Sequence, residues 1–142
     1  MSSAVLLLTL QSHKLRENNL SLRISELQSH KTLAVYAQGD ARAIKAQEEQ
    51  EVRDYFKGLY NDDEEYYGKY SDYTEIPDFQ EEMDRIAAKY QDELEDLSAW
   101  ETQLDAEITV NSAELEELKA YDESYKGWLT NNINNEYNLS LS

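Results

Sequence analysis

The 142-residue chain has no cysteine, a single proline and only four glycines. Without cysteine it can form neither disulfides nor thiolate metal sites. The scarcity of proline and glycine argues against a fold of many short strands joined by tight turns. With 30% of its residues charged, the composition is typical of long helices.

Motifs for catalysis and for membrane insertion are also missing. No nucleophile–base constellation and no helical Glu-x-x-His motif occurs, so we predict no enzymatic activity, no cofactor and no bound metal. No apolar run approaches the roughly 20 residues that span a bilayer, so we expect no membrane span. The first residues lack the basic start and small-residue cleavage site of a secretory signal, and we expect no cleaved signal peptide.

Charge divides the chain into two unequal parts. Residues 1–47 carry six Lys/Arg against three Asp/Glu, whereas residues 48–142 hold 27 Asp/Glu against seven Lys/Arg. The net charge of −17 opposes binding to nucleic acid. A basic segment followed by an acidic one suggests surfaces that lie against each other, either within one chain or between copies.

The acidic part has the clearest helical periodicity. Its apolar residues recur every three or four positions, which predicts an amphipathic helix over residues 78–137 with a coiled-coil-like seam. Thr109-Val110-Asn111-Ser112 is a candidate break, because β-branched residues precede a possible cap. Alternatively, the helix continues and Asn111 lies in the seam, where it could set the register. The periodic residues are Phe79, Met83, Ile86, Tyr90, Leu94, Leu97, Trp100, Leu104, Ile108, Leu115, Leu118, Tyr121, Tyr125, Leu129, Ile133 and Tyr137.

The basic part predicts a second long helix over residues 1–60. Two rows repeat every seven residues: the first is Leu8, Leu15 and Leu22, and the second is Leu20, Leu27, Ala34 and Ala41. Gly39-Asp40 is a possible kink, since Gly suits a helix end and Asp suits the cap of the next helix. Two arms of similar length joined by a short segment predict an all-α fold, a long antiparallel helical hairpin of coiled-coil type.

The segment that joins the arms, residues 61–77, is acidic and rich in tyrosine. We expect it to form the tip of the hairpin or an exposed insertion. The tyrosines favour two interpretations equally: an exposed adhesive surface, because Tyr offers a large contact area at low entropic cost, or a local core made by Tyr66, Tyr70 and Tyr73. The candidate exposed aromatic residues are Tyr60, Tyr66, Tyr67, Tyr70 and Tyr73.

Two sets of possible ligands have simpler explanations. Asn61, Asp63 and Glu65 match the first oxygen ligands of an EF-hand loop, but Tyr66 stands where that loop needs glycine, which favours a solvated acidic tip. His13 and His30 lack a second imidazole or a nucleophile at a useful spacing. We expect both histidines to be exposed.

The two ends of the chain carry the strongest indication of function. Residues 3–10 are apolar around much of a helix, more than one antiparallel partner covers, and the apolar residues of the C-terminal tail would lie beside them. This patch predicts an interface between subunits. Its candidate residues are Val5, Leu6, Leu7, Leu8, Leu10, Leu15, Ile133, Tyr137 and Leu139.

Residues 12–28, with the sequence SHKLRENNLSLRISELQ, are rich in Asn, Ser and Leu. This stretch resembles the first helix of flagellins, and the arrangement as a whole is similar to the filament subunits of flagellar and type III export systems. The resemblance implies an N-terminal and a C-terminal helix joined by a variable exposed middle. It also implies polymerisation through the ends, with copies of the chain and an export chaperone as partners.

These observations predict a non-enzymatic structural protein that assembles with copies of itself into a filament or fibre. The alternative is a cytosolic coiled-coil adaptor or export chaperone that binds an amphipathic client helix. A filament subunit would reach the cell surface or the exterior by export without a signal peptide. An adaptor would stay in the cytoplasm.

Overall fold

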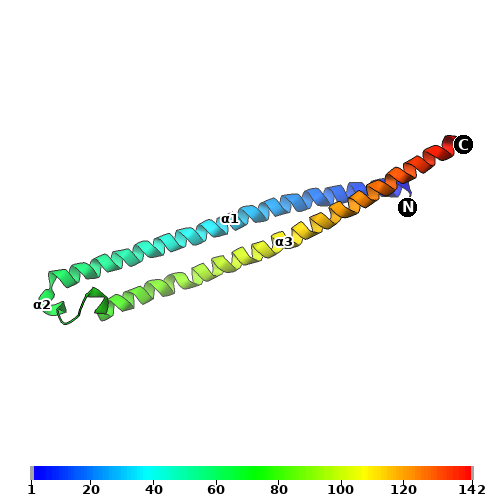
Figure 1. Ribbon diagram of the computed structural model, residues 1–142. Coiled ribbons are helices and arrows are strands. Elements are labelled where there is room, and N and C mark those ends of the chain that lie inside the picture. The colour runs from blue at the N-terminus through cyan, green and yellow to red at the C-terminus, as the bar shows by residue number, and fades with distance from the viewer. Residues whose placement is uncertain (1, 142) are drawn as a thin grey trace. The chain divides into compact units, whose positions relative to one another are not determined.

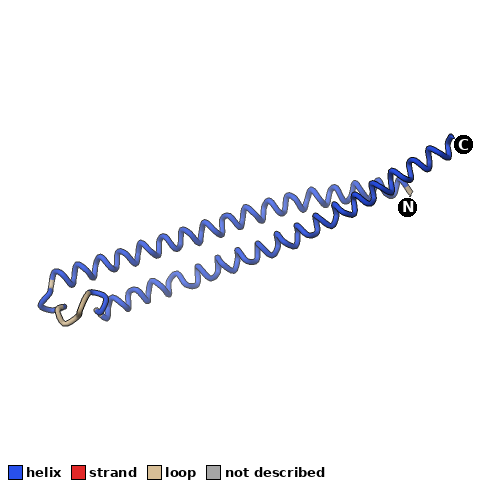
Figure 2. The backbone as a smooth tube through the Cα atoms, viewed as in Figure 1, coloured by secondary structure: helices blue, strands red, loops and turns tan. Residues whose placement is uncertain are grey.

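The computed structural model describes the backbone of residues 2–141 and the side chains of residues 2–138. Helix α1 spans Ser3–Asp62, the short α2 spans Glu64–Tyr67, a 3-10 turn spans Tyr73–Glu75, and α3 spans Pro77–Leu141 (Figures 1 and 2). No strand occurs among the described residues. The predicted fold class is confirmed: the chain is all-α, and its two long helices pack against each other as in a helical hairpin.

The chain divides into two compact units, each with its own part of α1 and of α3. The terminal unit comprises residues 1–31 and 103–142, and the tip unit comprises residues 32–102. Within each unit the two helical segments run antiparallel. In the terminal unit Arg16 pairs with Glu114 while Lys31 pairs with Asp105. In the tip unit Gln38 bonds to Glu101 while residues 48 and 89 form an ion pair.

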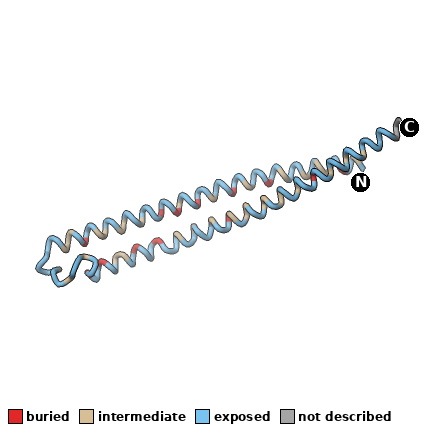
Figure 3. The backbone as a smooth tube through the Cα atoms, viewed as in Figure 1, coloured by how far each residue is buried: buried red, intermediate tan, exposed pale blue. Residues whose placement is uncertain are grey.

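In the terminal unit a single row of α1 supplies most of the buried apolar side chains. Leu6, Leu20 and Leu27 are at most 2% exposed and are spaced by multiples of seven residues, with His13 completing the row (Figure 3). Leu104 is their buried counterpart on α3. Burial of one heptad row is the expected result of packing a helix against a single antiparallel partner.

In the tip unit the chain closes around a cluster of aromatic and aliphatic side chains. Phe56, Ile76 and Phe79 are buried together, and the rings of Phe56 and Phe79 meet edge-to-face with centroids 5.7 Å apart. Such a geometry is favourable because the positive ring edge meets the negative ring face. The buried side chains of this unit are Ala34, Gln38, Ala41, Phe56, Ile76, Phe79, Ile86 and Tyr90.

Acidic side chains organise the segment between the long helices. The carboxylate of Asp63 accepts the backbone N–H of Tyr66 and caps α2, and Asp72 accepts the N–H of Thr74 and caps the 3-10 turn. Gly68 ends α2, where a Cβ would collide with the carbonyl oxygen of Glu64. Pro77 then occupies the first position of α3, where its missing N–H costs nothing.

Helix α1 continues through Gly39-Asp40, the position of the possible kink. No described residue has a positive φ angle, and the helix continues with Ala34, Gln38 and Ala41 all buried on one side of it. Packing on both sides of the glycine outweighs its helix penalty of about 1 kcal/mol.

Helix α3 likewise continues through residues 109–112. The side-chain amide of Asn111 donates to the carbonyl oxygen of Glu107 at 2.7 Å, and Thr109 Oγ1 donates to that of Asp105 at 2.9 Å. Both side chains therefore bond to the preceding turn of their own helix, a pattern that polar residues use inside helices. Asn111 is half-buried, and its amide is directed to its own helix.

Candidate functional site

The candidate assembly residues of α1 lie in the terminal unit and are mostly exposed. Leu8 and Leu15 are 66% and 65% exposed, while Val5 and Leu7 are about half exposed. On α3, Ile133 and Tyr137 are also exposed. Exposed apolar side chains of this size, repeated along one helix, are a feature of surfaces that bind other proteins.

Two of the predicted interface residues belong to the interior instead. Leu6 is fully buried, so its inclusion in an exposed patch is wrong: it begins the inward row that continues with Leu20 and Leu27. Leu10 is half-buried beside the same seam. The side chain of Leu139 lies outside the described residues.

The structure adds Leu22 to the exposed surface. Leu22 is 65% exposed and follows Leu8 and Leu15 at the same seven-residue spacing, so the three leucines form one row. Leu8 and Leu22 each follow a buried leucine, Leu6 or Leu20, by two positions. The exposed row is therefore rotated by about 200° around the helix from the buried row. The spacing was visible in the sequence, but spacing alone does not tell which of two heptad rows faces inward.

Polar residues interrupt the seam of the terminal unit. Nδ1 of His13 lies 2.7 Å from Oδ1 of Asp122, and the ring of Tyr125 lies 5.6 Å from the His13 ring. Asp122 is only 6% exposed and His13 is half-buried, so the expectation that His13 is solvated is wrong. The interaction joins α1 to α3 because a buried carboxylate needs a hydrogen-bond donor. His30 is on the exposed side of α1.

The side chain of Glu17 lies near the pair of His13 and Asp122, and its charged form is unfavourable there. A hydrogen bond with Asp122, burial and the repulsion from the Asp122 charge raise the pKa of Glu17, while Lys119 and Lys126 oppose the shift. One carboxyl oxygen of Glu17 is buried without a hydrogen-bond partner. Two carboxyl groups that share a hydrogen bond need a proton between them, which explains the direction of the shift.

The tyrosines of the tip unit are mainly core residues. Tyr60, Tyr67, Tyr70 and Tyr73 are half-buried and pack against the cluster of Phe56, Ile76 and Phe79. The hydroxyl of Tyr60 donates to the carbonyl oxygens of residues 70 and 71 at 3.0 and 3.1 Å. The predicted exposed aromatic tip is therefore wrong for these four residues.

Tyr66 is the exposed member of the predicted aromatic tip, at 59%. Its ring lies 4.9 Å from the ammonium group of Lys69, a cation–π contact. The local core contains Tyr67 rather than Tyr66, because α2 turns the first of these two adjacent rings outward.

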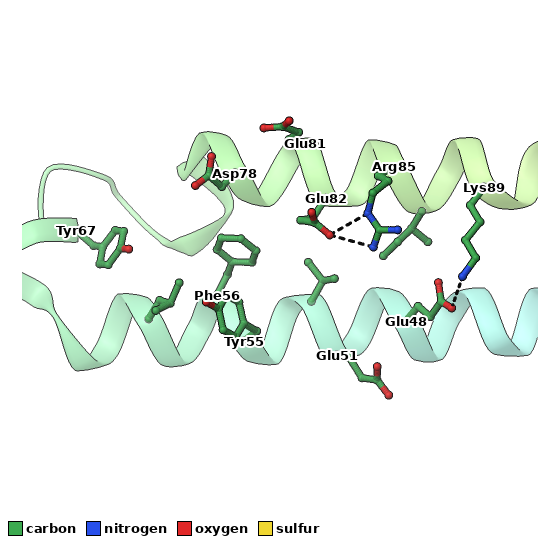
Figure 4. A pocket seen from close by; sticks show the side chains of 13 residues that line it. Glu48, Glu51, Tyr55, Phe56, Tyr67, Asp78, Glu81, Glu82, Arg85 and Lys89 are labelled. Atoms are coloured by element: carbon green, nitrogen blue, oxygen red, sulfur yellow. Dashed lines mark hydrogen bonds and ion pairs between the residues drawn. The ribbon is translucent and has the colours of Figure 1, made fainter.

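A groove of about 760 Å³ runs along the tip unit between α1 and α3. The apolar side chains that line it include Val52, Phe56 and Ile86. Glu51 lies on the α1 side of the groove and Glu81 on the α3 side (Figure 4). The other residues that line it are Glu48, Tyr55, Leu59, Tyr67, Asp78, Glu82, Arg85 and Lys89. An apolar floor between acidic edges suits a basic amphipathic segment.

One end of the groove is bridged by an ion pair. Oε1 of Glu48 accepts a hydrogen bond from Nζ of Lys89 at 2.9 Å (Figure 4). It accepts a second one from the hydroxyl of Tyr90 at 2.8 Å. Lys89 and then Tyr90 lower the pKa of Glu48, because both donors favour its charged form. The same contact raises the pKa of Lys89 and of Tyr90.

The described residues contain neither a metal-binding cluster nor a membrane-spanning helix. No group of three or more His, Cys, Asp or Glu side chains there is placed to hold a metal ion, and Asp63 in the acidic run caps α2. Within residues 2–141, no helix combines the length and the apolar character that crossing a membrane requires.

Comparison with protein-family models, with curated protein sequences and with solved structures finds no match for the chain. The resemblance to flagellar filament subunits therefore stays a prediction. The site is interpreted from its own geometry.

Proposed function

We propose that this chain is a non-enzymatic structural protein whose copies associate through the terminal unit into a filament or fibre. The observation that carries this proposal is the set of large apolar side chains that the terminal unit leaves in solvent. Burying one leucine side chain stabilises an association by roughly 1.5–3 kcal/mol. The exposed set is Val5, Leu7, Leu8, Leu15, Leu22, Val110, Tyr121, Trp128, Ile133 and Tyr137.

The charge of the terminal unit supports association between copies. Residues 1–31 carry four Lys/Arg against two Asp/Glu, and residues 103–142 carry eight Asp/Glu against two Lys. Arg16, Arg23 and Lys31 already pair with carboxylates of their own chain. The excess of acid on α3 attracts the basic helix of a neighbouring copy, so assembly should weaken as salt screens these charges.

The test is to measure the size of the purified chain as its concentration rises, by sedimentation velocity, in low and in moderate salt. Negative-stain electron microscopy of the same samples then shows whether large species are regular filaments. We expect growth with concentration, and more growth in low salt. A chain that stays monomeric throughout would contradict the proposal.

The groove of the tip unit favours a second candidate function, that of an adaptor or export chaperone for a client helix. Its acidic edges at Glu51 and Glu81 fit a basic amphipathic peptide, whose apolar face would cover Phe56. Calorimetric titration with such a peptide tests this function, and Glu51→Lys with Glu81→Lys should weaken the binding. A monomeric chain that binds the peptide would favour the adaptor over the filament subunit.

A further inference from the structure

The exposed leucine row of α1 has a complementary row of small residues on the outer face of α3. Ala106, Ala113, Ala120 and Gly127 are exposed and also repeat every seven residues. Each lies two positions after a residue of the inward row of α3, such as Leu104 or Asn111, and therefore about 200° around the helix. A Cβ added at Gly127 would meet no atom within 4 Å, so the surface there is open.

The two rows match in spacing, and the row of small residues is one repeat longer. Leu8 to Leu22 spans 14 steps, about 21 Å of helix, and Ala106 to Gly127 spans 21 steps, about 32 Å. Large side chains at seven-residue intervals fit the spaces between small ones at the same intervals, as knobs fit into holes. Each row faces away from the other helix of its own unit, so the two rows lie on opposite sides of the helix pair.

The ion pairs within the terminal unit show which residues of the two rows lie at the same height along the helix pair. Arg16 pairs with Glu114 and His13 pairs with Asp122, so residues 13–16 of α1 lie alongside residues 114–122 of α3. A second copy displaced sideways without rotation would therefore present the stretch from Ala113 to Ala120 at the height of Leu15. Leu22 would lie one repeat further along α3, toward Ala106, and Leu8 one repeat the other way, toward Gly127.

Charge selects the outer face of α3 as the partner of the leucine row. The row Leu8, Leu15 and Leu22 is continued by uncharged exposed residues at Gln11, Asn18 and Ser25, with Lys14 at its edge. The alanine row is bordered by exposed carboxylates at Glu116, Glu117 and Glu123, which outnumber the two exposed lysines at its edge, Lys119 and Lys126. Two leucine rows facing each other would bring together two segments of net positive charge. The alanine row instead lies on a segment of net negative charge, which attracts the basic segment that carries the leucine row.

We infer that the row Leu8, Leu15 and Leu22 docks onto the row Ala106, Ala113, Ala120 and Gly127 of a second copy of this chain. This inference rests on the proposed self-assembly and specifies its contact. The two rows are different surfaces on opposite sides of the unit, so the contact is heterologous. Each added copy leaves one leucine row and one alanine row free, which makes growth open-ended.

The experiment uses two variants that each remove one row. Leu15→Glu with Leu22→Glu blocks the leucine row, and Ala113→Glu with Ala120→Glu blocks the alanine row. Leu33→Glu with Ala46→Glu is the matched control, because it adds the same charge at exposed positions outside both rows. Circular dichroism checks that all variants remain helical. The neutral double variant Leu15→Gln with Leu22→Gln removes the apolar contact without adding negative charge, so it distinguishes loss of apolar burial from charge repulsion as the cause of lost assembly.

We expect each row variant alone to sediment as a monomer at concentrations at least tenfold above those at which the wild type and the control assemble. A mixture of the two row variants retains one intact surface of each kind. It should give a 1:1 dimer of twice the 16.5 kDa chain mass that grows no further.

Other outcomes overturn the inference and separate its failure from that of the proposed function. If the wild type assembles and both row variants assemble equally well, the rows are not the contact, although self-assembly stands. If only the leucine variant fails to assemble, leucine rows pair with each other and the assigned partner surface is wrong. If the wild type never associates, the inference and the proposed function fail together.

Discussion

The terminal unit and the tip unit are built from the same two helices but bury different chemistry. In the tip unit Phe56 and Phe79 are buried, and half-buried tyrosines pack against them. In the terminal unit the seam includes His13 and Asp122, while Leu8, Leu15 and Leu22 face solvent. The exposed leucine row lies on the side of α1 opposite this partly polar seam, and it is the surface that we propose to meet a second copy of the chain.

Removing a ring from the tip cluster should have the largest effect on stability. Phe79→Ala leaves a cavity between Phe56 and Tyr73, whose rings lie 5.7 and 5.3 Å from that of Phe79. We expect a loss of about 3–5 kcal/mol in the free energy of unfolding, measured by urea denaturation. Tyr66→Ala is the control, since that ring is 59% exposed and its loss should cost less than about 1 kcal/mol.

A pair of leucines in the terminal unit separates its core from its proposed contact surface. Leu27 is 1% exposed and Leu22 is 65% exposed. Leu27→Ala should lower the free energy of unfolding of the monomer by about 2–5 kcal/mol. Leu22→Ala should change it by less than about 0.5 kcal/mol while weakening assembly. Equal losses of monomer stability would show that Leu22 is buried and would remove the contrast between the two rows.

Substitution of Gly39 tests whether α1 needs a glycine at this position in the tip unit. A Cβ at this position meets no atom within 4 Å, and the glycine is helical. Gly39→Ala should therefore raise the free energy of unfolding by roughly 0.5–1 kcal/mol, because alanine loses less backbone entropy in a helix. A destabilised Gly39→Ala variant, measured by thermal unfolding, would indicate that the helix bends there and needs the glycine.

The contributions of Glu17 and Glu48 to stability, one in each unit, should change with pH in opposite directions. The pKa of Glu17 in the terminal unit is raised above its ordinary value of 4.5, so its contribution to stability is lost as pH rises through the raised pKa. The pKa of Glu48 in the tip unit is lowered, so its contribution is present above pH 4.5 and is lost as pH falls through the lowered pKa.

Glu17→Gln and Glu48→Gln measure this difference. At neutral pH, Glu17→Gln should stabilise the chain, by less than about 1 kcal/mol, and Glu48→Gln should destabilise it. The urea midpoint of Glu17→Gln should converge with that of the wild type below pH 4.5, and that of Glu48→Gln should converge only when the pH falls below the lowered pKa of Glu48. Two variants that shift in the same direction at neutral pH would refute the assignment of opposite roles to these carboxylates.

Periodicity predicted the helices because it is a local property of the chain. The recurrence of apolar residues every three or four positions requires an amphipathic helix, and Pro77 marks the start of α3 at the position where proline is tolerated. The candidate interruptions at Gly39 and at residues 109–112 were inferred from propensity alone. Propensity is worth at most about 1 kcal/mol per residue, and packing along the seam outweighs it.

The residues of the candidate site depend on which of two heptad rows faces inward, and the sequence does not distinguish the two rows. Both Leu8-Leu15-Leu22 and Leu20-Leu27 follow a seven-residue repeat, and the identity of a leucine does not show which way it faces. Likewise Tyr66 and Tyr67 are adjacent and chemically equal, yet α2 exposes the first and places the second against Phe56.

Composition and spacing along one chain were enough to predict the all-α class, the two long helices, the acidic surface and the apolar residues near the ends. Packing of the two helices was needed to show that Leu6 is core and Leu22 is surface, and that His13 meets Asp122 across the seam. The physical reason is that burial depends on the angle at which one helix meets another, and that angle is set jointly by side chains far apart in the sequence.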